Sequence, residues 1–254
     1  MTETLSPPRS SRRLRSRVTI IGVLGEILVT GGVVVLLFLG WQLWFNNVVS
    51  SNEQASVAEN LSEHWATTAP IATPGPTAVR DPGTPAVTAT PEANAAFANL
   101  IIPRLGADFK RPIAEGVGTA VLDNTKLGMG HYAETQLPGQ LGNFALASHR
   151  SAYGGAFHNI HQLVVGDPIW VETADGWYKY IYRSMEYVHA SGVGVILPVP
   201  QNPGLAPTES VITLTTCNPF YSSAERIIAY GVYDSWYPRA DGPPAEIATI
   251  ATVS

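Results

Sequence analysis

The sequence contains very little cysteine and little charge. Cys217 is the only cysteine in 254 residues, so the chain cannot close a disulfide on itself and is not a disulfide-stabilised scaffold. Charged residues make up 14% of the sequence, and the formal net charge is −5. Outside the N-terminus no cluster of basic residues is present, which argues against a nucleic-acid partner.

Metal-ligand clusters and amphipathic helical patterns are also scarce. After the N-terminal region, the best candidate for one or two helical turns is 155–163, which contains His158 and His161. These histidines can share a helix face, but no third ligand follows at a suitable spacing. A surface or packing role is favoured for both, and we expect no metal site.

One long apolar run is present, at residues 18–45, with Glu26 as its only charge. It exceeds the roughly 20 apolar residues that cross a bilayer, and it lacks the small-residue cleavage site of a removable signal peptide. The preceding residues 1–17 are basic, which predicts that they are cytoplasmic, and Trp41 and Trp44 fall at the outer interface. These features favour a single-pass plasma-membrane anchor, with the rest of the chain extracellular, over a buried helix of a soluble protein.

Two further segments have the composition of spacers. Residues 46–96 are rich in Ala, Thr, Pro, Ser and Asn without apolar periodicity, which predicts a mostly disordered stalk. Within it, residues 53–64 are the one stretch able to form a short helix. Residues 240–254 have the character of a C-terminal tail. The intervening residues 97–239 have the length of one domain.

The pattern of residues 97–239 predicts an all-β domain. Short β-branched or aromatic segments alternate with Gly, Pro, Asn and Asp, and the Ala-Asp-Gly at 174–176 indicates a hairpin. Many short strands predict a barrel or a sandwich, and a closed barrel is favoured because it removes exposed strand edges. The expected strands are 99–106, 118–124, 142–149, 167–188, 194–200, 210–217 and 225–236.

Cys217 stands at the end of one expected strand. Alternation along SVITLTTC places Thr215 and Cys217 on one face, and the same rule places Arg226 and Ile228 together on the next strand. If these two strands pair, the thiol and the guanidinium meet in one groove. Strands hold such a pair more rigidly than a free loop does.

A histidine is needed to complete a site of this kind. Of the six histidines, His149 follows the apolar stretch 142–148 and precedes a loop with glycines, which predicts a position at the rim of a barrel. His131, which follows Gly-Met-Gly, is the second choice and would line the same groove.

The residues alone leave two readings of Cys217 open. Most free cysteines are small buried hydrophobes. A thiolate is nevertheless a strong nucleophile once a cation or a base assists it, and His149 and Arg226 are available for this. Arg226 stays protonated and cannot be a base, but its guanidinium can donate several hydrogen bonds to an oxyanion.

Three stretches resemble one known family. TLTTC at 213–217 resembles the TLxTC signature of sortases, with the arginine on the following strand. The stretch 130–150 is similar to the sortase segment around the active-site histidine, and 157–173 resembles another stretch of the family. LPGQLGNFALASHR and the N-terminal GEILVTGGVVVLLFLGWQLW are most similar to class E sortases of actinobacteria.

The resemblance implies a closed eight-stranded β-barrel with short helices and a cysteine transpeptidase that needs no cofactor. It implies that Cys217 attacks a Thr–Gly bond in the sorting signal of a secreted protein, LAxTG-like or LPxTG-like. His149 would transfer protons, and Arg226 would steady the substrate and the oxyanion. The acceptor would be an amine of a peptidoglycan precursor or a pilin lysine. The expected substrate-binding residues are Thr215, Thr216, Asn218 and His131.

Two other functions are compatible with parts of this pattern. One is a membrane-tethered binding or pilus-assembly scaffold with an inactive site, which the intact Cys, His and Arg disfavour. The other is an L,D-transpeptidase-like enzyme of peptidoglycan, which also uses Cys and His in a β domain. The order of His149, Cys217 and Arg226 along the chain favours a sortase.

Overall fold

The computed structural model describes residues 19–68 and 84–251, which form a long N-terminal helix and a β domain. The chain divides into two compact units, Met1–Leu43 and Trp44–Ser254. The expected basic tail at 1–17, part of the expected stalk at 69–83 and the last residues, 252–254, lie outside the described part of the chain.

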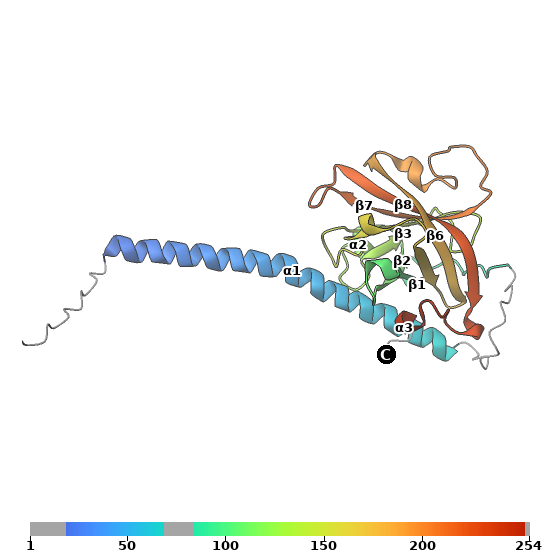
Figure 1. Ribbon diagram of the computed structural model, residues 1–254, viewed down its shortest axis with the longest axis horizontal. Coiled ribbons are helices and arrows are strands. Elements are labelled where there is room, and N and C mark those ends of the chain that lie inside the picture. Colours follow the sequence, from blue (N-terminus) through green and yellow to red (C-terminus); the bar gives the residue numbers. More distant parts are fainter. Residues whose placement is uncertain (1–18, 69–83, 252–254) are drawn as a thin grey trace, which may run out of the picture. The chain divides into compact units, whose positions relative to one another are not determined.

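The β domain is a closed barrel of eight strands, as expected. Its strands follow the order β1-β2-β3-β4-β7-β8-β6-β5, and Figure 1 shows how they wrap around the core. The pairs β2–β3 and β4–β7 are parallel, and the other neighbours are antiparallel. The strands are β1 (Ala96–Ile101), β2 (Lys110–Glu115), β3 (Met129–His131), β4 (Gly142–Ser148), β5 (Pro168–Glu172), β6 (Gly176–His189), β7 (Ser210–Asn218) and β8 (Glu225–Pro238).

Alternation along the strands builds the core. On β7, Ile212 and Leu214 point into the barrel with Phe144 and Leu146 of β4, and all four are buried. The opposite face of β7 lies outside the barrel, where Val211 packs against residues of β8 and of the connection that precedes β7. The sequence period of two therefore fixes which side chains face the core and which face the outer surface of this sheet.

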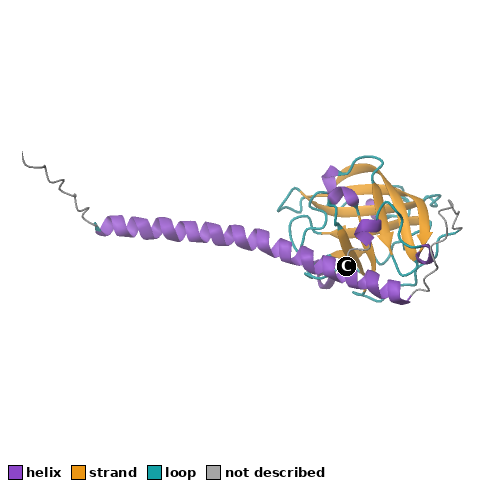
Figure 2. Ribbon diagram, turned by 60° about the horizontal axis from the view of Figure 1, so that its bottom comes forward, coloured by secondary structure: helices purple, strands orange, loops and turns teal. Residues whose placement is uncertain are grey.

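Short helical segments occupy the connections between strands (Figure 2). Two expected strands are wrong. Residues 119–122 form the helical turn α2 (Thr119–Leu122), which follows Gly118, and 193–196 form the 3₁₀ turn η3 (Val193–Ile196), after which two prolines at 198 and 200 cannot donate to a ladder. Short apolar runs do not by themselves distinguish strand from helix. The other turns are η1 (Pro103–Leu105), η2 (Ile160–Gln162), η4 (Arg239–Asp241) and α3 (Ala248–Ala251).

The N-terminal helix α1 runs from Ile20 to Thr68. Its apolar part, up to residue 42, exposes its side chains and is long and apolar enough to cross a membrane. The helix does not end at residue 45, where the sequence predicts a stalk. Residues 46–68 continue the helix, so the expected disordered spacer is corrected there, and the proposed short helix at 53–64 is one part of a longer one.

Residues 44–68 lie along the outside of the barrel within the second unit (Figure 1). Ser62 donates a 2.6 Å hydrogen bond to Glu172 of β5, and Asn99 of β1 donates to the carbonyl of Ala58 at 2.9 Å. The buried positions of this stretch follow a helical period: Ser50, Gln54, Ala58, Ser62 and Trp65. Because most of these side chains are small or polar, hydropathy does not reveal the buried face.

The C-terminal residues also differ from the expected tail. Ile247 and Ile250 are buried and pack against Trp170 of β5 and Trp177 of β6. Arg239, directly after β8, donates to Glu172 at 3.0 Å. The described residues after 239 are therefore part of the folded domain, because they cover apolar rings on the outer surface of the barrel.

Candidate active site

Cys217 and Arg226 lie directly opposite each other on the antiparallel strands β7 and β8, as the alternation pattern predicts. Directly opposed residues project to the same face of a sheet, which here is the outer face. Cys217 is a free thiol and is partly exposed. The guanidinium of Arg226 is held at the turn between the strands, where NH1 donates to the carbonyls of Ser223 and Glu225, both at 2.9 Å.

His149 follows directly after β4, which runs parallel to β7 and pairs Ala147 with Thr215. His149 lies as far beyond Ala147 as Cys217 lies beyond Thr215, so His149 and Cys217 are at the same level of the two strands. Thr216 donates a 2.8 Å hydrogen bond to the carbonyl of Ser148, which keeps the two strand ends together beyond the ladder. The fold therefore brings His149, Cys217 and Arg226 to one end of the three neighbouring strands β4, β7 and β8.

The imidazole of His149 has two partners that the sequence did not reveal. Its Nε2 lies 2.8 Å from Oδ1 of Asp123, at the end of α2, and its ring centroid lies 5.4 Å from that of Tyr153. A carboxylate that accepts the Nε2–H leaves Nδ1 as the basic nitrogen of the neutral ring. The side chain is 30% exposed, so it remains accessible to a substrate.

Thr215 and Thr216 have a different role from the expected contact with substrate. Both side chains are buried, and the hydroxyl of Thr215 donates to the carbonyl of Leu146 at 3.0 Å. The Thr216 hydroxyl is already used in its bond to Ser148, and a hydroxyl has a single proton to donate. These two threonines fasten β7 to β4 and thereby fix the position of Cys217.

Asn218 holds the turn beside Cys217. Its Nδ2 donates to Glu225 Oε2 at 2.9 Å, and its Oδ1 accepts a hydrogen bond from NH1 of Arg150. Arg150 is buried and also stacks on the ring of Phe220, with its Cζ 4.0 Å from the ring centroid. The only feature of the sequence that indicates a role of Arg150 near the site is its position directly after His149.

His131 is not in the groove, so the expectation that it lines the same surface is wrong. Its side chain is 2% exposed, because β3 turns it toward the barrel interior. Nδ1 lies 2.8 Å from Glu115 Oε2, and Nε2 lies 3.0 Å from the Thr135 hydroxyl and 3.1 Å from the carbonyl of Gln136. This histidine belongs to a buried polar network.

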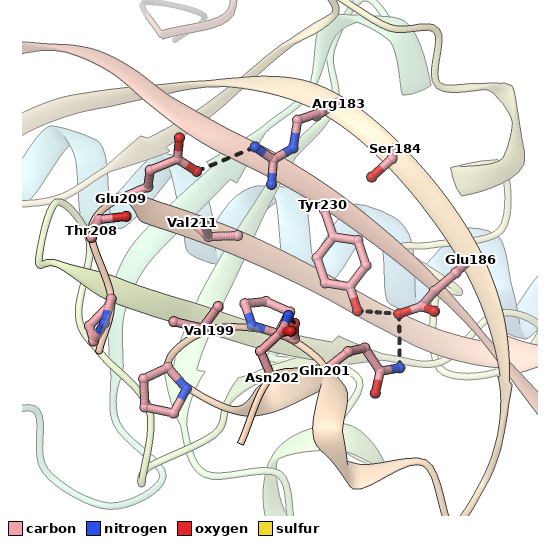
Figure 3. Close-up of a pocket in the computed structure, with 13 residues that line it drawn as sticks. Arg183, Ser184, Glu186, Val199, Gln201, Asn202, Thr208, Glu209, Val211 and Tyr230 are labelled. Atoms are coloured by element: carbon pink, nitrogen blue, oxygen red, sulfur yellow. Dashed lines mark hydrogen bonds and ion pairs between the residues drawn. The ribbon is translucent and has the colours of Figure 1, made fainter. Parts of the chain in front are cut away.

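A pocket of about 350 Å³ lies further along the same outer face (Figure 3). Val211 and Tyr230 form part of its wall, and the segment that precedes β7 covers it. The Tyr230 hydroxyl donates to Glu186 at 2.5 Å, and Gln201 donates to the same carboxylate oxygen at 3.1 Å. Burial and this carboxylate raise the pKa of Tyr230, so the phenol stays protonated at neutral pH.

Within residues 19–68 and 84–251, no group of three or more His, Cys, Asp or Glu side chains could hold a metal ion. The reactive groups at the end of β4, β7 and β8 are a thiol, an imidazole with a carboxylate partner and a guanidinium. This combination suits nucleophilic attack on a carbonyl carbon, with proton transfer and stabilisation of negative charge on oxygen.

Comparison with known proteins identifies the family. The model of the sortase domain matches residues 100–234, a range that contains Cys217, His149 and Arg226. The chain belongs to the sortase family. Its members are cysteine transpeptidases, in agreement with the resemblance seen in the sequence.

The similar sortases include E-type enzymes. Sortase SrtE1 of Streptomyces coelicolor is 38% identical over an alignment of 252 residues, which covers 94% of this chain and 66% of that protein. The crystal structure of sortase E1 from Streptomyces coelicolor with a tripeptide in the active site is 40% identical, with a TM-score of 0.56 over 61% of this chain and 97% of that chain. The SrtA sortase from Actinomyces oris is 35% identical, with a TM-score of 0.63 over 68% of this chain and 98% of that chain.

Proposed function

We propose that this sortase is a membrane-anchored transpeptidase that cleaves a Thr–Gly bond in the C-terminal sorting signal of secreted proteins. The acyl group is then transferred to an amine, either of a peptidoglycan precursor or of a pilin lysine. The observation that carries this proposal is the convergence of His149, Cys217 and Arg226 at one end of three paired strands. Intact chemistry at this position disfavours an inactive scaffold.

In the first half-reaction, the sulfur of Cys217 attacks the carbonyl carbon of the threonine. The thiol proton goes to His149, and the tetrahedral intermediate carries its negative charge on oxygen. The carbon–nitrogen bond to glycine then breaks, and the leaving amine takes the proton from His149. The products are a thioester on Cys217 and a peptide with a free amino terminus.

In the second half-reaction, the acceptor amine attacks the thioester carbonyl and gives a proton to His149. The carbon–sulfur bond breaks, and the departing sulfur regains its proton from the imidazole. An amide bond to the acceptor forms, and the enzyme returns to its starting state. A single histidine serves as base and acid in both steps, which requires that its ring keeps one orientation.

Arg226 is proposed to donate hydrogen bonds to the substrate carbonyl that becomes the oxyanion. The two backbone carbonyls that hold NH1 fix the plane of the guanidinium. Thr215, Thr216 and Asn218 act indirectly, because their hydrogen bonds place the end of β7 relative to β4 and β8.

The pocket beside Tyr230 is proposed to receive the leading apolar residue of the sorting signal. Tyr230 pairs with Thr213, which lies about 13 Å along β7 from Cys217 at roughly 3.3 Å per residue. An extended peptide with its scissile bond at Cys217 spans this length with four residues. The lining includes apolar side chains that suit a leucine: Pro198, Val199, Pro207 and Val211.

Residues 18–45 are proposed to anchor the protein in the plasma membrane, with residues 1–17 in the cytoplasm. The arginines before the apolar run and the tryptophans near its end support this orientation. The catalytic domain, 97–239, is then extracellular, where secreted proteins and cell-wall amines are available. The helical residues 46–68 connect the anchor to this domain.

The test is cleavage of a quenched fluorescent sorting peptide, together with intact-mass detection of the acyl-enzyme. Cys217→Ala is expected to abolish turnover. His149→Ala is expected to lose at least the 10²–10⁴-fold that is typical of general acid–base groups. Arg226→Lys keeps the charge but loses the planar fork of donors, so it is expected to be severely impaired. A folded Cys217→Ala enzyme that still cleaves would refute the proposal.

A further inference from the structure

Two polar side chains of α1 contact the loop that follows His149. Gln54 donates from Nε2 to the carbonyl of Tyr153 at 2.7 Å. Asn47 donates to the carbonyl of Ser151 at 3.2 Å and accepts from the backbone N–H of Gly154 at 3.3 Å. Residues 47 and 54 are two helical turns apart and share one face of the helix. The segment that follows the apolar run therefore holds the loop beside the proposed catalytic histidine.

Gln54 also contacts the connection that precedes β3. Its side chain is fully buried between Gly128 and Gly154, whose φ angles are +69° and +86°. An ideal Cβ at Gly128 would lie 2.1 Å from Nε2 of Gln54, and one at Gly154 would lie 2.9 Å from the same atom. Both positions favour glycine, because their φ angles lie in the left-handed region and a Cβ at either would displace the amide of Gln54.

Gln54 joins two segments, and each of them is linked to one partner of the hydrogen bond between His149 and Asp123. Gly128 donates its N–H to the carbonyl of Val121 in α2, the turn that Asp123 directly follows. Tyr153 packs against the ring of His149, and His149 in turn binds Asp123. Gln54 thus closes a ring of contacts around the His149–Asp123 pair.

Stability alone does not account for Gln54. Its Oε1 is buried and has no hydrogen-bond partner among the described residues, which costs free energy that an apolar side chain would avoid. Other contacts fasten the same helix to the barrel far from this loop, among them the bond of Ser62 to Glu172 and the ion pair of Lys110 with Glu59 at 3.1 Å. A polar side chain at position 54 is explained by the loop that it holds.

We propose that Gln54 and Asn47 are positioning residues, through which the helix that continues the anchor orients the His149–Asp123 pair. This inference rests on the proposed function of His149. It makes the residues directly after the apolar run part of the catalytic apparatus, in addition to their role as a connection. Loss of Gln54 frees the loop 151–154 and the α2–β3 connection, so the imidazole loses its fixed orientation.

The test compares full-length variants in detergent micelles. Gln54→Ala is expected to lower kcat for a sorting peptide by about tenfold or more, with KM within about twofold, because a small displacement of a catalytic group costs rate more than binding. Asn47→Ala, at a half-buried position, is expected to have a smaller effect in the same direction. Ser56→Ala, on the exposed face of the same helix, is the matched control and is expected to leave kcat unchanged.

Ser62→Ala distinguishes orientation of His149 from attachment of α1 to the barrel. It removes a buried contact of α1, with Glu172, that lies far from the loop 151–154. It is expected to lower Tm and to leave kcat unchanged. The inference is refuted if Ser62→Ala and Gln54→Ala lower Tm equally and also lower kcat equally. It is refuted as well if both Gln54→Ala and Asn47→Ala have the kcat of the unaltered chain.

A second measurement does not depend on turnover. The ring resonances of His149 are followed by NMR in ¹³C-histidine-labelled protein and assigned with His149→Gln. Gln54→Ala is expected either to shift the His149 signal in the direction seen for Asp123→Ala or to broaden it. Ser62→Ala is expected to leave the signal in place. If sorting peptides are not cleaved at all, the proposed function fails, yet this spectrum still decides whether Gln54 orients the histidine. An unchanged His149 signal in Gln54→Ala would refute the positioning role.

Discussion

The Nε2 of His149 lies 2.8 Å from Oδ1 of Asp123, which joins the end of β4 to the end of α2. In the proposed mechanism, this hydrogen bond selects the tautomer of the imidazole and leaves Nδ1 to exchange a proton with Cys217. We therefore propose a site of four residues, in which Asp123 joins the three that the sequence indicated.

Replacing Asp123 by Ala is expected to lower kcat/KM by about 10–100-fold, by analogy with the loss seen when the hydrogen-bond partner of a metal-bound histidine is removed. The protein is expected to stay folded, because the carboxylate is 38% exposed. Peptide cleavage measures the loss, and ¹⁵N chemical shifts of the His149 ring in the unaltered chain are expected to show Nε2 protonated. A ring that is protonated only at Nδ1 would contradict the assigned tautomer.

Replacing His131 by Ala is expected to affect stability and not chemistry. The change leaves the buried carboxylate of Glu115 without its 2.8 Å partner, which costs roughly 3 kcal/mol of unfolding free energy. Denaturant unfolding measures this loss, and active-site titration of the folded enzyme is expected to give nearly unaltered kcat/KM. If His131→Ala is stable and less active than His149→Ala, His149 is not the catalytic base.

The similarity to class E sortases leads us to expect a preference for Leu-Ala-x-Thr-Gly over Leu-Pro-x-Thr-Gly peptides. Two peptides that differ only at the second position are compared by kcat/KM under identical conditions. Equal values, or a higher value for the proline peptide, would contradict this preference while leaving the transpeptidase proposal intact.

The proposed topology places the C-terminus outside the cell. A reporter that is active only after export, fused after Ser254, is expected to be active, and a cytoplasm-only reporter at the same place is expected to be silent. The fusion follows Ser254 because Ile247 and Ile250 are buried and an earlier junction would disturb the domain. Activity of the cytoplasmic reporter would overturn the orientation and the substrate class with it.

The pair of Arg104 and Asp167 predicts a pH dependence of stability. Arg104 donates to both carboxylate oxygens of Asp167, at 2.7 and 2.8 Å, and this lowers the pKa of Asp167. The pair therefore stabilises the fold above the unfolded pKa of about 3.9, and the contribution disappears as the pH falls through the lower folded pKa. Arg104→Gln is expected to lower Tm at pH 7 and to match the unaltered chain near pH 2, as thermal unfolding will show. A Tm difference that persists unchanged in acid would mean that packing of Arg104, not charge, is responsible.

Local patterns were enough for the strands that carry the site. The alternation in 210–217 correctly separated the inward Ile212 and Leu214 from the outward Cys217, and the turn at 174–176 correctly predicted the β5–β6 hairpin. The same patterns failed at 118–124 and 194–200, because a short apolar run fits a helical turn as well as a strand. The number of eight strands was expected only from the resemblance to sortases, and the order of the strands in the barrel was not predicted.

The sequence by itself determined the apolar helix, the sheet face of Cys217 and the residue opposite it, because each follows from a period within one element or from two strands joined by a short turn. Only the tertiary structure decided that His131 is buried, that Asp123 binds His149, and that residues 46–68 form a docked helix. Those facts depend on contacts between distant segments, such as that of Gln54 with Tyr153, 99 residues apart. Small and polar side chains make these contacts, so their burial leaves no hydropathy signal and is set by the surfaces that the folded barrel presents.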